Sequence, residues 1–123
     1  MINGSGEKTA VMVYKIIAAA AWAEAIKTGV FSGSADDLRD GFIHLSSAIQ
    51  IPGTLAKHFA GRADLLVIGF DSVELGDLLK WERSRGGELF PHYYGHLPVK
   101  QAQFLKQLTL NPDGQAIVDD GTL

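Results

Sequence analysis

Two short segments of the chain each carry a histidine among aromatic, glycine and hydroxyl neighbours. They are Asp40-Gly-Phe-Ile-His-Leu-Ser46 and Glu88-Leu-Phe-Pro-His-Tyr-Tyr-Gly95. Near neutral pH an imidazole can donate a hydrogen bond, accept one or carry a charge. The two segments therefore predict a polar pocket around His44 and His92. The alternative for each is a buried histidine whose ring nitrogens form their hydrogen bonds within the fold.

The residues beside His92 favour a site for a planar ligand. Tyr93 and Tyr94 can stack on a flat ring and donate hydrogen bonds at its rim. Pro91 holds the preceding residue in an extended conformation, and Gly95 frees the backbone downstream. The alternative is an aromatic cluster that caps the core.

Glu82 is the third candidate for chemistry. It follows Trp81 and precedes Arg83 and Arg85. A carboxylate beside an aromatic ring can have a raised pKa, or it can polarise a sugar hydroxyl. The alternative is a surface glutamate paired with an arginine.

The histidines do not predict a metal site. His92 and His96 have a spacing that suits zinc on a helix, but Pro91, Gly95 and Pro98 disfavour a helix there. The chain has no cysteine, which excludes disulfides and thiolate chemistry and fits a reducing cytoplasm.

Periodicity and turn residues predict the elements that position these side chains. The clearest are a first strand, an Ala-rich helix that ends at Gly29, and an apolar central strand. Pro52 is tolerable in the first turn of a second helix, and the chain from 98 to 110 fits either a helix or a closing strand. The full prediction is strand 11–17, helix 18–27, loop 32–37, strand 41–46, helix 48–59, strand 65–70, strand 78–82, loop 83–87, extended segment 90–95 and turn 111–114.

These elements do not alternate strictly, so the predicted fold class is α+β with a largely antiparallel sheet. With 123 residues, we expect one domain over residues 12–123, preceded by a disordered extension over residues 1–11. No stretch approaches the roughly 20 apolar residues of a membrane helix. The net charge of -3 argues against nucleic acid as the main partner. We expect a cytoplasmic protein.

Together these motifs resemble a bacterial family known as domain of unknown function 952. The resemblance spans residues 13–110. The family has no established activity, but its fold is similar to that of the ADP-ribosyltransferases, in which two small, mainly antiparallel sheets with flanking helices surround a cleft that binds NAD. Residues 43–46 also look like a segment of RNA 2′-phosphotransferases. The motifs are Tyr14-Lys-Ile, Trp22 with Ala25 and Gly29, both histidine segments, and Trp81-Glu82.

The resemblance implies roles for individual residues. His44 matches the histidine that bonds a ribose hydroxyl, and Glu82 can supply the carboxylate that steadies an oxocarbenium-like transition state. Tyr93 or Tyr94 can supply the ring that stacks on nicotinamide. The usual order is His, Tyr, Glu, whereas Glu82, like Glu88, precedes both tyrosines.

Three further residues complete the predicted site. His92 is a second polar anchor, Ser46 is a hydroxyl in the cleft, and Lys15 can meet a phosphate, with a solvent-facing strand lysine as the alternative. The predicted function is a cleft that binds NAD or another nucleotide-like small molecule, with ADP-ribosyl transfer as the reaction. The alternative is a non-catalytic binding or interaction module with a vestigial cleft.

Overall fold

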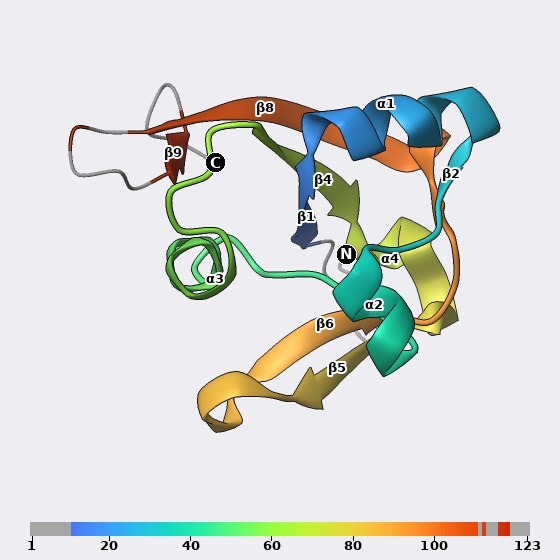
Figure 1. Cartoon of the computed structure of the whole chain (residues 1–123). Coiled ribbons are helices and arrows are strands. Elements are labelled where there is room, and N and C mark those ends of the chain that lie inside the picture. The colour runs from blue at the N-terminus through green and yellow to red at the C-terminus, as the bar shows by residue number, and fades with distance from the viewer. Residues whose placement is uncertain (1–10, 111, 113–115, 119–123) are drawn as a thin grey trace, which may run out of the picture.

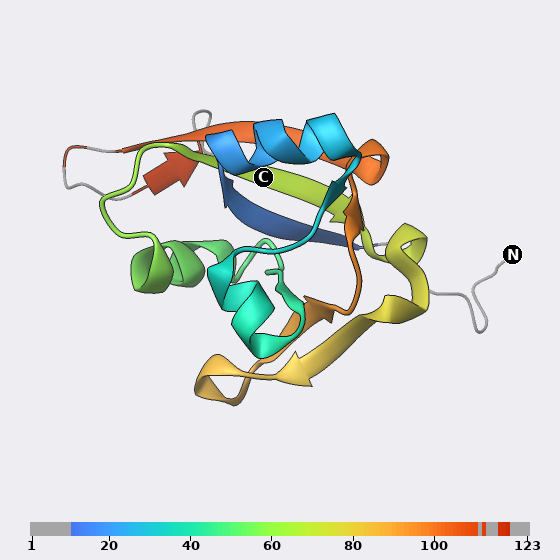
Figure 2. The same cartoon turned by 45° about the vertical axis from the view of Figure 1, so that its right-hand side comes forward.

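The computed structural model describes residues 11–110, 112 and 116–118. The predicted N-terminal extension lies outside these residues except for Val11, and so does most of the predicted turn at 111–114. Short helices and three antiparallel sheets make up the described part (Figures 1 and 2). The α+β class with small antiparallel sheets is therefore confirmed, with a two-stranded sheet in addition to the two that were expected.

The largest sheet has the strand order β1-β4-β8-β9. Its strands are β1 (Met12–Ala18), β4 (Leu65–Asp71), β8 (Ala102–Leu110) and β9 (Ala116–Val118). β4 lies between β1 and β8, as its continuous apolar run predicted. The ambiguous stretch from 98 to 110 is mainly the strand β8, because the alternation of buried and exposed side chains in its middle follows a period of two.

Helix α1 (Ala19–Thr28) follows β1 directly and buries Trp22 and Ala25. It ends at Gly29, which has the positive φ of 89° that favours glycine, so this predicted helix and its stop are confirmed. The chain then forms β2 (Val30–Phe31), which pairs with β7 (Leu97–Pro98).

The predicted loop at 32–37 is wrong in its second half, because helix α2 occupies Ala35–Asp40. The signal is a capping box. The Ser34 hydroxyl accepts a hydrogen bond from the backbone N–H of Asp37, and the Asp37 carboxylate accepts one from the N–H of Ser34. The composition of the segment suggested a loop, but the Ser-x-x-Asp spacing begins a helix.

The second sheet has the order β3-β6-β5. Its strands are β3 (Ile43–His44), β6 (Leu89–Tyr93) and β5 (Leu79–Arg83). β3 is shorter than predicted, and the side chains around it alternate, since Ile43 and Leu45 are buried while Phe42 and His44 are partly exposed. In Figure 2 this sheet lies below the main sheet, with α2 in front of it.

The remaining helices connect the sheets. Helix α3 (Ile51–His58) has Pro52 in its first turn, as predicted, although it begins later than expected and ends before Gly61. Helix α4 (Ser72–Leu75) follows β4. Three 3-10 turns complete the connections, at Gly76–Leu78, Arg85–Gly87 and Val99–Gln101, the second of them inside the predicted loop 83–87.

A short bridge between Tyr14 and Ser46 joins the two main sheets. The N–H of Tyr14 donates to the carbonyl of Ser46 at 2.8 Å, and the N–H of Ser46 donates to the carbonyl of Tyr14 at 2.9 Å. This bridge fixes β1 beside the segment that carries His44. It therefore brings Lys15, on β1, to the same region as the first histidine segment.

Candidate functional site

Lys15 and Asp37 form a buried ion pair. The Lys15 ammonium lies 3.1 Å from Oδ1 and 2.9 Å from Oδ2 of Asp37, and it also donates to the backbone carbonyl of His44 at 3.0 Å. The two side chains are 8% and 2% exposed. The alternative interpretation of Lys15 as a solvent-facing strand lysine is therefore wrong, because its ammonium is held inside the fold by a carboxylate.

His44 is bonded through both ring nitrogens. Nδ1 lies 2.6 Å from Oδ1 of Asp37, and Nε2 lies 2.9 Å from Oδ2 of Asp40. The backbone N–H of His44 also donates to Asp37 at 3.0 Å. Ionised carboxylates only accept hydrogen bonds, so the ring donates to both partners only when both nitrogens carry protons.

The charges in this network shift the pKa values of its members. Burial disfavours the Asp37 carboxylate, but the hydrogen bonds from His44 and the charge of Lys15 outweigh burial and hold the pKa of Asp37 far below its ordinary range. Burial also lowers the pKa of Lys15, which the Asp37 carboxylate opposes. Asp40 has a lowered pKa because Arg39 donates to it, with a smaller effect from His44.

His92 forms a second pair with a carboxylate. Its Nδ1 lies 2.7 Å from Oε1 of Glu82, and the Tyr94 hydroxyl donates to the same oxygen at 2.8 Å. These hydrogen bonds lower the pKa of Glu82, and the bond to Glu82 raises the pKa of Tyr94. The expectation of a raised pKa at Glu82 is wrong, because two donors stabilise its charged form.

Phe42 packs against both histidines. Its ring is stacked on His92 with centroids 4.0 Å apart, and it lies 4.6 Å from the ring of His44. The histidines face each other across β3 and β6, where His44 and His92 are direct partners in the register. Their ring centroids are 5.7 Å apart.

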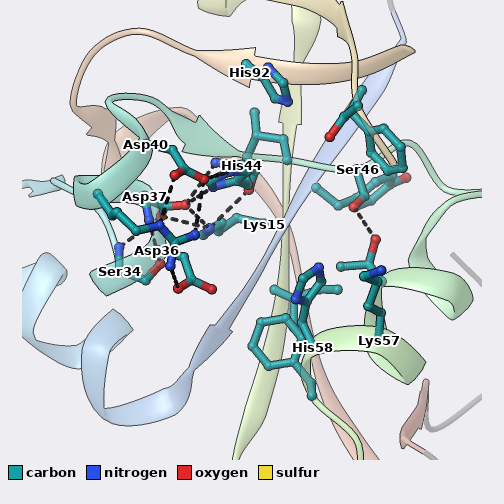
Figure 3. A pocket seen from close by; sticks show the side chains of 18 residues that line it. Lys15, Ser34, Asp36, Asp37, Asp40, His44, Ser46, Lys57, His58 and His92 are labelled. Atoms are coloured by element: carbon teal, nitrogen blue, oxygen red, sulfur yellow. Dashed lines mark hydrogen bonds and ion pairs between the residues drawn. The ribbon is translucent and has the colours of Figure 1, made fainter. Parts of the chain in front are cut away.

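A pocket of about 330 Å³ opens beside these groups (Figure 3). One wall is made by Lys15, the α2 carboxylates and His44, and His92 lies at a second side. Figure 3 shows Lys57 and His58, both from α3, across the pocket from His44. Between the walls, the hydroxyls of Ser46 and Thr54 are 3.0 Å apart.

The structure brings some of the predicted residues to the pocket and leaves others outside it. Four line it: Lys15, His44, Ser46 and His92. Glu82 and Tyr94 do not line it, but they support His92 through its Nδ1. The predicted role of Tyr93 as a ligand-stacking ring does not fit its place, because Tyr93 is 6% exposed and packs in the hydrophobic core.

The remaining predicted residues lie elsewhere. Glu88 accepts a hydrogen bond from the Gln50 side chain, and Nδ1 of His96 bonds the Ser32 hydroxyl. His92 and His96 do not share a helix. Within the described part of the chain, no three histidine or carboxylate side chains are grouped so that they could hold a metal ion.

Sequence reasoning missed three groups of the pocket. Asp37 and Asp40 stand in a segment that was assigned to a loop and its flank, although the Ser34-x-x-Asp37 capping box marks the helix that places them. Lys57 has no such signal. Like Lys27, it occupies an exposed helix position, and only the fold shows that it lines the pocket across from α2.

Comparisons with known proteins give a consistent result. The crystal structure of protein CC0527 from Caulobacter crescentus is similar to this chain, with a TM-score of 0.85 and 45% identity over 89% of this chain and 96% of that one. The solution NMR structure of the same protein gives a TM-score of 0.77 and 46% identity, over 85% of this chain and 90% of that one.

Two further findings bear on identity. No curated protein matches the chain, and no helix in its described part is long and apolar enough to cross a membrane. A family model described as "Protein of unknown function (DUF952)" matches residues 16–103. This match covers well over half of the sequence, and it includes both histidine segments and most of the residues that line the pocket. The chain therefore belongs to the DUF952 family.

Proposed function

We propose that the pocket binds a nucleotide-like ligand, with NAD or an ADP-ribosyl group as the first candidates. The observation that carries the proposal is Lys57, which lies across the pocket from α2 and has no ion-pair partner among the described residues, whereas the α2 carboxylates are paired with Lys15 and Arg39. Three carboxylates of α2 line one side, and Lys57 and His58 line the other. The carboxylates are those of Asp36, Asp37 and Asp40.

Lys57 is the cation that supports an anionic ligand. Lys15 and Arg39 also line the pocket, but each is paired with a carboxylate of the protein. Among the described residues, Lys57 has no ion-pair partner of its own. An ammonium group in that position suits a phosphate as its partner.

NAD fits both walls, because it combines an anionic pyrophosphate with a cationic nicotinamide ring and ribose hydroxyls. The pyrophosphate would lie toward Lys57, and the cationic and hydroxyl-bearing end toward Asp40 and Ser46. A pocket of about 330 Å³ is at the lower end of the range for small-molecule sites. It would hold the nicotinamide ribose and adjoining phosphate, with the rest of the dinucleotide outside.

The resemblance to the ADP-ribosyltransferase fold extends the proposal to group transfer. In that reaction a carboxylate stabilises the positive charge that develops at the ribose. Glu82 does not line the pocket, whereas Asp40 does, and its side chain is 34% exposed. We therefore assign to Asp40 the role that the sequence suggested for Glu82.

Titration with NAD and ADP-ribose tests the proposal. Isotope-labelled protein is titrated while the imidazole resonances are followed by NMR, and binding is expected to move those of His44 and His92 while leaving His96 unchanged. His96 is a suitable internal control because it lies outside the pocket. Unmoved His44 and His92 resonances at millimolar ligand would show that the proposal is wrong.

A non-catalytic binding or interaction module is the second candidate, and one observation favours it. Both ring nitrogens of His44 are bonded to carboxylates of the protein, as expected for a histidine that braces the fold. The variant His44→Asn separates the two functions. A large loss of stability supports the bracing role, whereas a stable fold that no longer binds NAD supports the ligand site.

A further inference from the structure

His92 differs from His44 in having one ring nitrogen available. Its Nδ1 is bonded to Glu82, but nothing among the described residues bonds its Nε2. The residue is only 4% exposed, and it lines the pocket. An imidazole nitrogen that is accessible from a pocket and has no protein partner can bond a ligand or a water molecule there. The Nε2 atom of His92 therefore marks a contact point for a ligand.

Glu82 determines what kind of contact this is. The hydrogen bonds from His92 and Tyr94 lower the pKa of Glu82, so its carboxylate is ionised near neutral pH and can only accept. The proton between the two side chains therefore belongs to Nδ1 of His92. In the uncharged ring, Nε2 is then the unprotonated nitrogen, and it accepts a proton or a hydrogen bond from a hydroxyl group.

We infer that His92 is a general base that activates a hydroxyl nucleophile in the pocket, and that Glu82 is its positioning residue. This inference rests on the proposed function, because the electrophile is the ribosyl carbon C1′ of NAD. Water or an acceptor hydroxyl attacks C1′, and its proton passes to Nε2 of His92. The C1′–N bond breaks, its electron pair stays with nicotinamide, and nicotinamide leaves uncharged.

The surroundings of His92 hold the ring in one orientation. Phe42 stacks on one face with an interplanar angle of 24°, and the ring lies opposite His44 in the strand register. Tyr94 donates to the same Glu82 oxygen as His92, which fixes the carboxylate. His44 cannot take the same role, because both its nitrogens already meet carboxylates.

The tautomer of His92 gives the first test, and it requires no ligand. We expect NMR of ¹⁵N-labelled protein, recorded where the ring is uncharged, to show a protonated Nδ1 and an unprotonated Nε2. In Glu82→Ala the preference should be lost, while in the control His96→Asn it should be unchanged. A wild-type ring protonated at Nε2 would overturn the assignment of the base.

Turnover gives the second test. Nicotinamide release from NAD is measured for the wild type, Glu82→Gln and His92→Asn. We expect kcat to fall by roughly 100-fold or more in both variants with little change in KM. Glu82→Gln is informative even if His92→Asn fails to fold, because the Glu82 side chain is 42% exposed.

The outcomes separate the two proposals. If NAD fails to bind although His92 has the expected tautomer, the proposed ligand is wrong and the general base has no NAD to act upon. If NAD binds but releases no nicotinamide, or if both variants keep the wild-type kcat, the ligand proposal stands and the general-base role is overturned. Loss of turnover with binding retained in Glu82→Gln supports both.

Discussion

His44 and His92 lie opposite each other on neighbouring strands, yet each ring is held by a different carboxylate. Asp37 bonds the first through Nδ1, and Glu82 bonds the second in the same way. The carboxylates come from different elements, α2 and β5. The pair therefore combines a partly exposed histidine, whose ring nitrogens both bond carboxylates, with a buried one whose second nitrogen is available to the pocket.

Replacing Asp37 tests the buried network. We expect Asp37→Asn to lower the free energy of unfolding by about 3–5 kcal/mol, because it leaves the Lys15 ammonium buried without a counter-ion. Urea unfolding followed by circular dichroism measures the change. Asp36→Asn is the matched control, since Asp36 is exposed on the same helix and should matter by less than about 1 kcal/mol. Equal effects of the two substitutions would contradict a special role for Asp37.

The depressed pKa of Asp37 also predicts how stability depends on pH. Its carboxylate has a lower pKa in the folded than in the unfolded protein, so the unfolded state binds the proton more readily. The stability that Asp37 contributes is fully present above the unfolded pKa, about 4, and it is lost as pH falls from there toward the folded pKa.

Thermal unfolding between pH 6 and pH 2 measures this dependence. The stability difference between the wild type and Asp37→Asn should shrink as pH falls below about 4. A difference that stays constant over that range would be inconsistent with the depressed pKa. Above about pH 5 Asp37 is ionised in both the folded and the unfolded protein, so it should add no further pH dependence to the stability difference.

Phe42 should couple the two histidines. The substitution Phe42→Leu keeps an apolar side chain but removes the ring stacked on His92 and beside His44. We expect the free energy of unfolding to fall by about 0.5–1.5 kcal/mol more than the loss of buried apolar area alone would cause. We also expect NAD to bind more weakly. Leu38→Ala serves as a control because Leu38 is 69% exposed. If Phe42→Leu binds NAD as the wild type does, ring stacking does not order the site.

Lys57 should act on the phosphates of the ligand. We expect Lys57→Ala to weaken NAD binding by up to about fivefold, the range of an exposed ion pair, and to reduce its dependence on salt. Calorimetric titration at two salt concentrations measures both effects. Lys27→Ala is the control, since Lys27 lies on α1 and pairs with Glu24. An unchanged affinity in Lys57→Ala would place the phosphates elsewhere.

Gly69 should be required at the centre of the main sheet. A Cβ at this position would lie 2.8 Å from Cε of Met12 and 2.9 Å from Cβ of Phe104. We expect Gly69→Ala to destabilise the fold by about 1–3 kcal/mol, the usual range for overpacking. The Met12 methyl can move aside but the Phe104 Cβ cannot, so Met12→Ala should rescue only part of the loss in the double variant. Full rescue would show that β4 and β8 can separate there.

The local elements were largely predictable where one sequence signal dominated. The apolar run at 65–70 gave the central strand, and Gly29 gave the end of α1. The stretch from 98 to 110 was not decided, because its apolar positions fit periods of both 3.6 and 2. Its pairing with β4, a contact distant in sequence, makes it a strand.

The candidate site was predictable in its histidines but not in its charges. His44 and His92 stand in distinctive segments, and they meet in space. The partners of these histidines could not be predicted in the same way. Asp37 reaches His44 through α2, whose capping box was overlooked, and Glu82 reaches His92 through strand pairing. Lys57 lines the pocket only because α3 lies across it from α2 (Figure 3). No local sequence pattern encodes this placement of the two helices.

Asp37 has a consequence for the order in which the site is assembled. Its carboxylate joins β1, the start of α2 and β3 through Lys15, Ser34 and His44. All of these residues belong to the first 44 of the chain, so this half of the pocket closes short loops of low entropic cost. His92 arrives only when β6 pairs with β3, across a much longer loop. A folding chain would therefore form the contacts of Asp37 with Lys15, Ser34 and His44 before His92 reaches the pocket. When refolding is followed by hydrogen exchange, the backbone amide of His44 should become protected before that of His92.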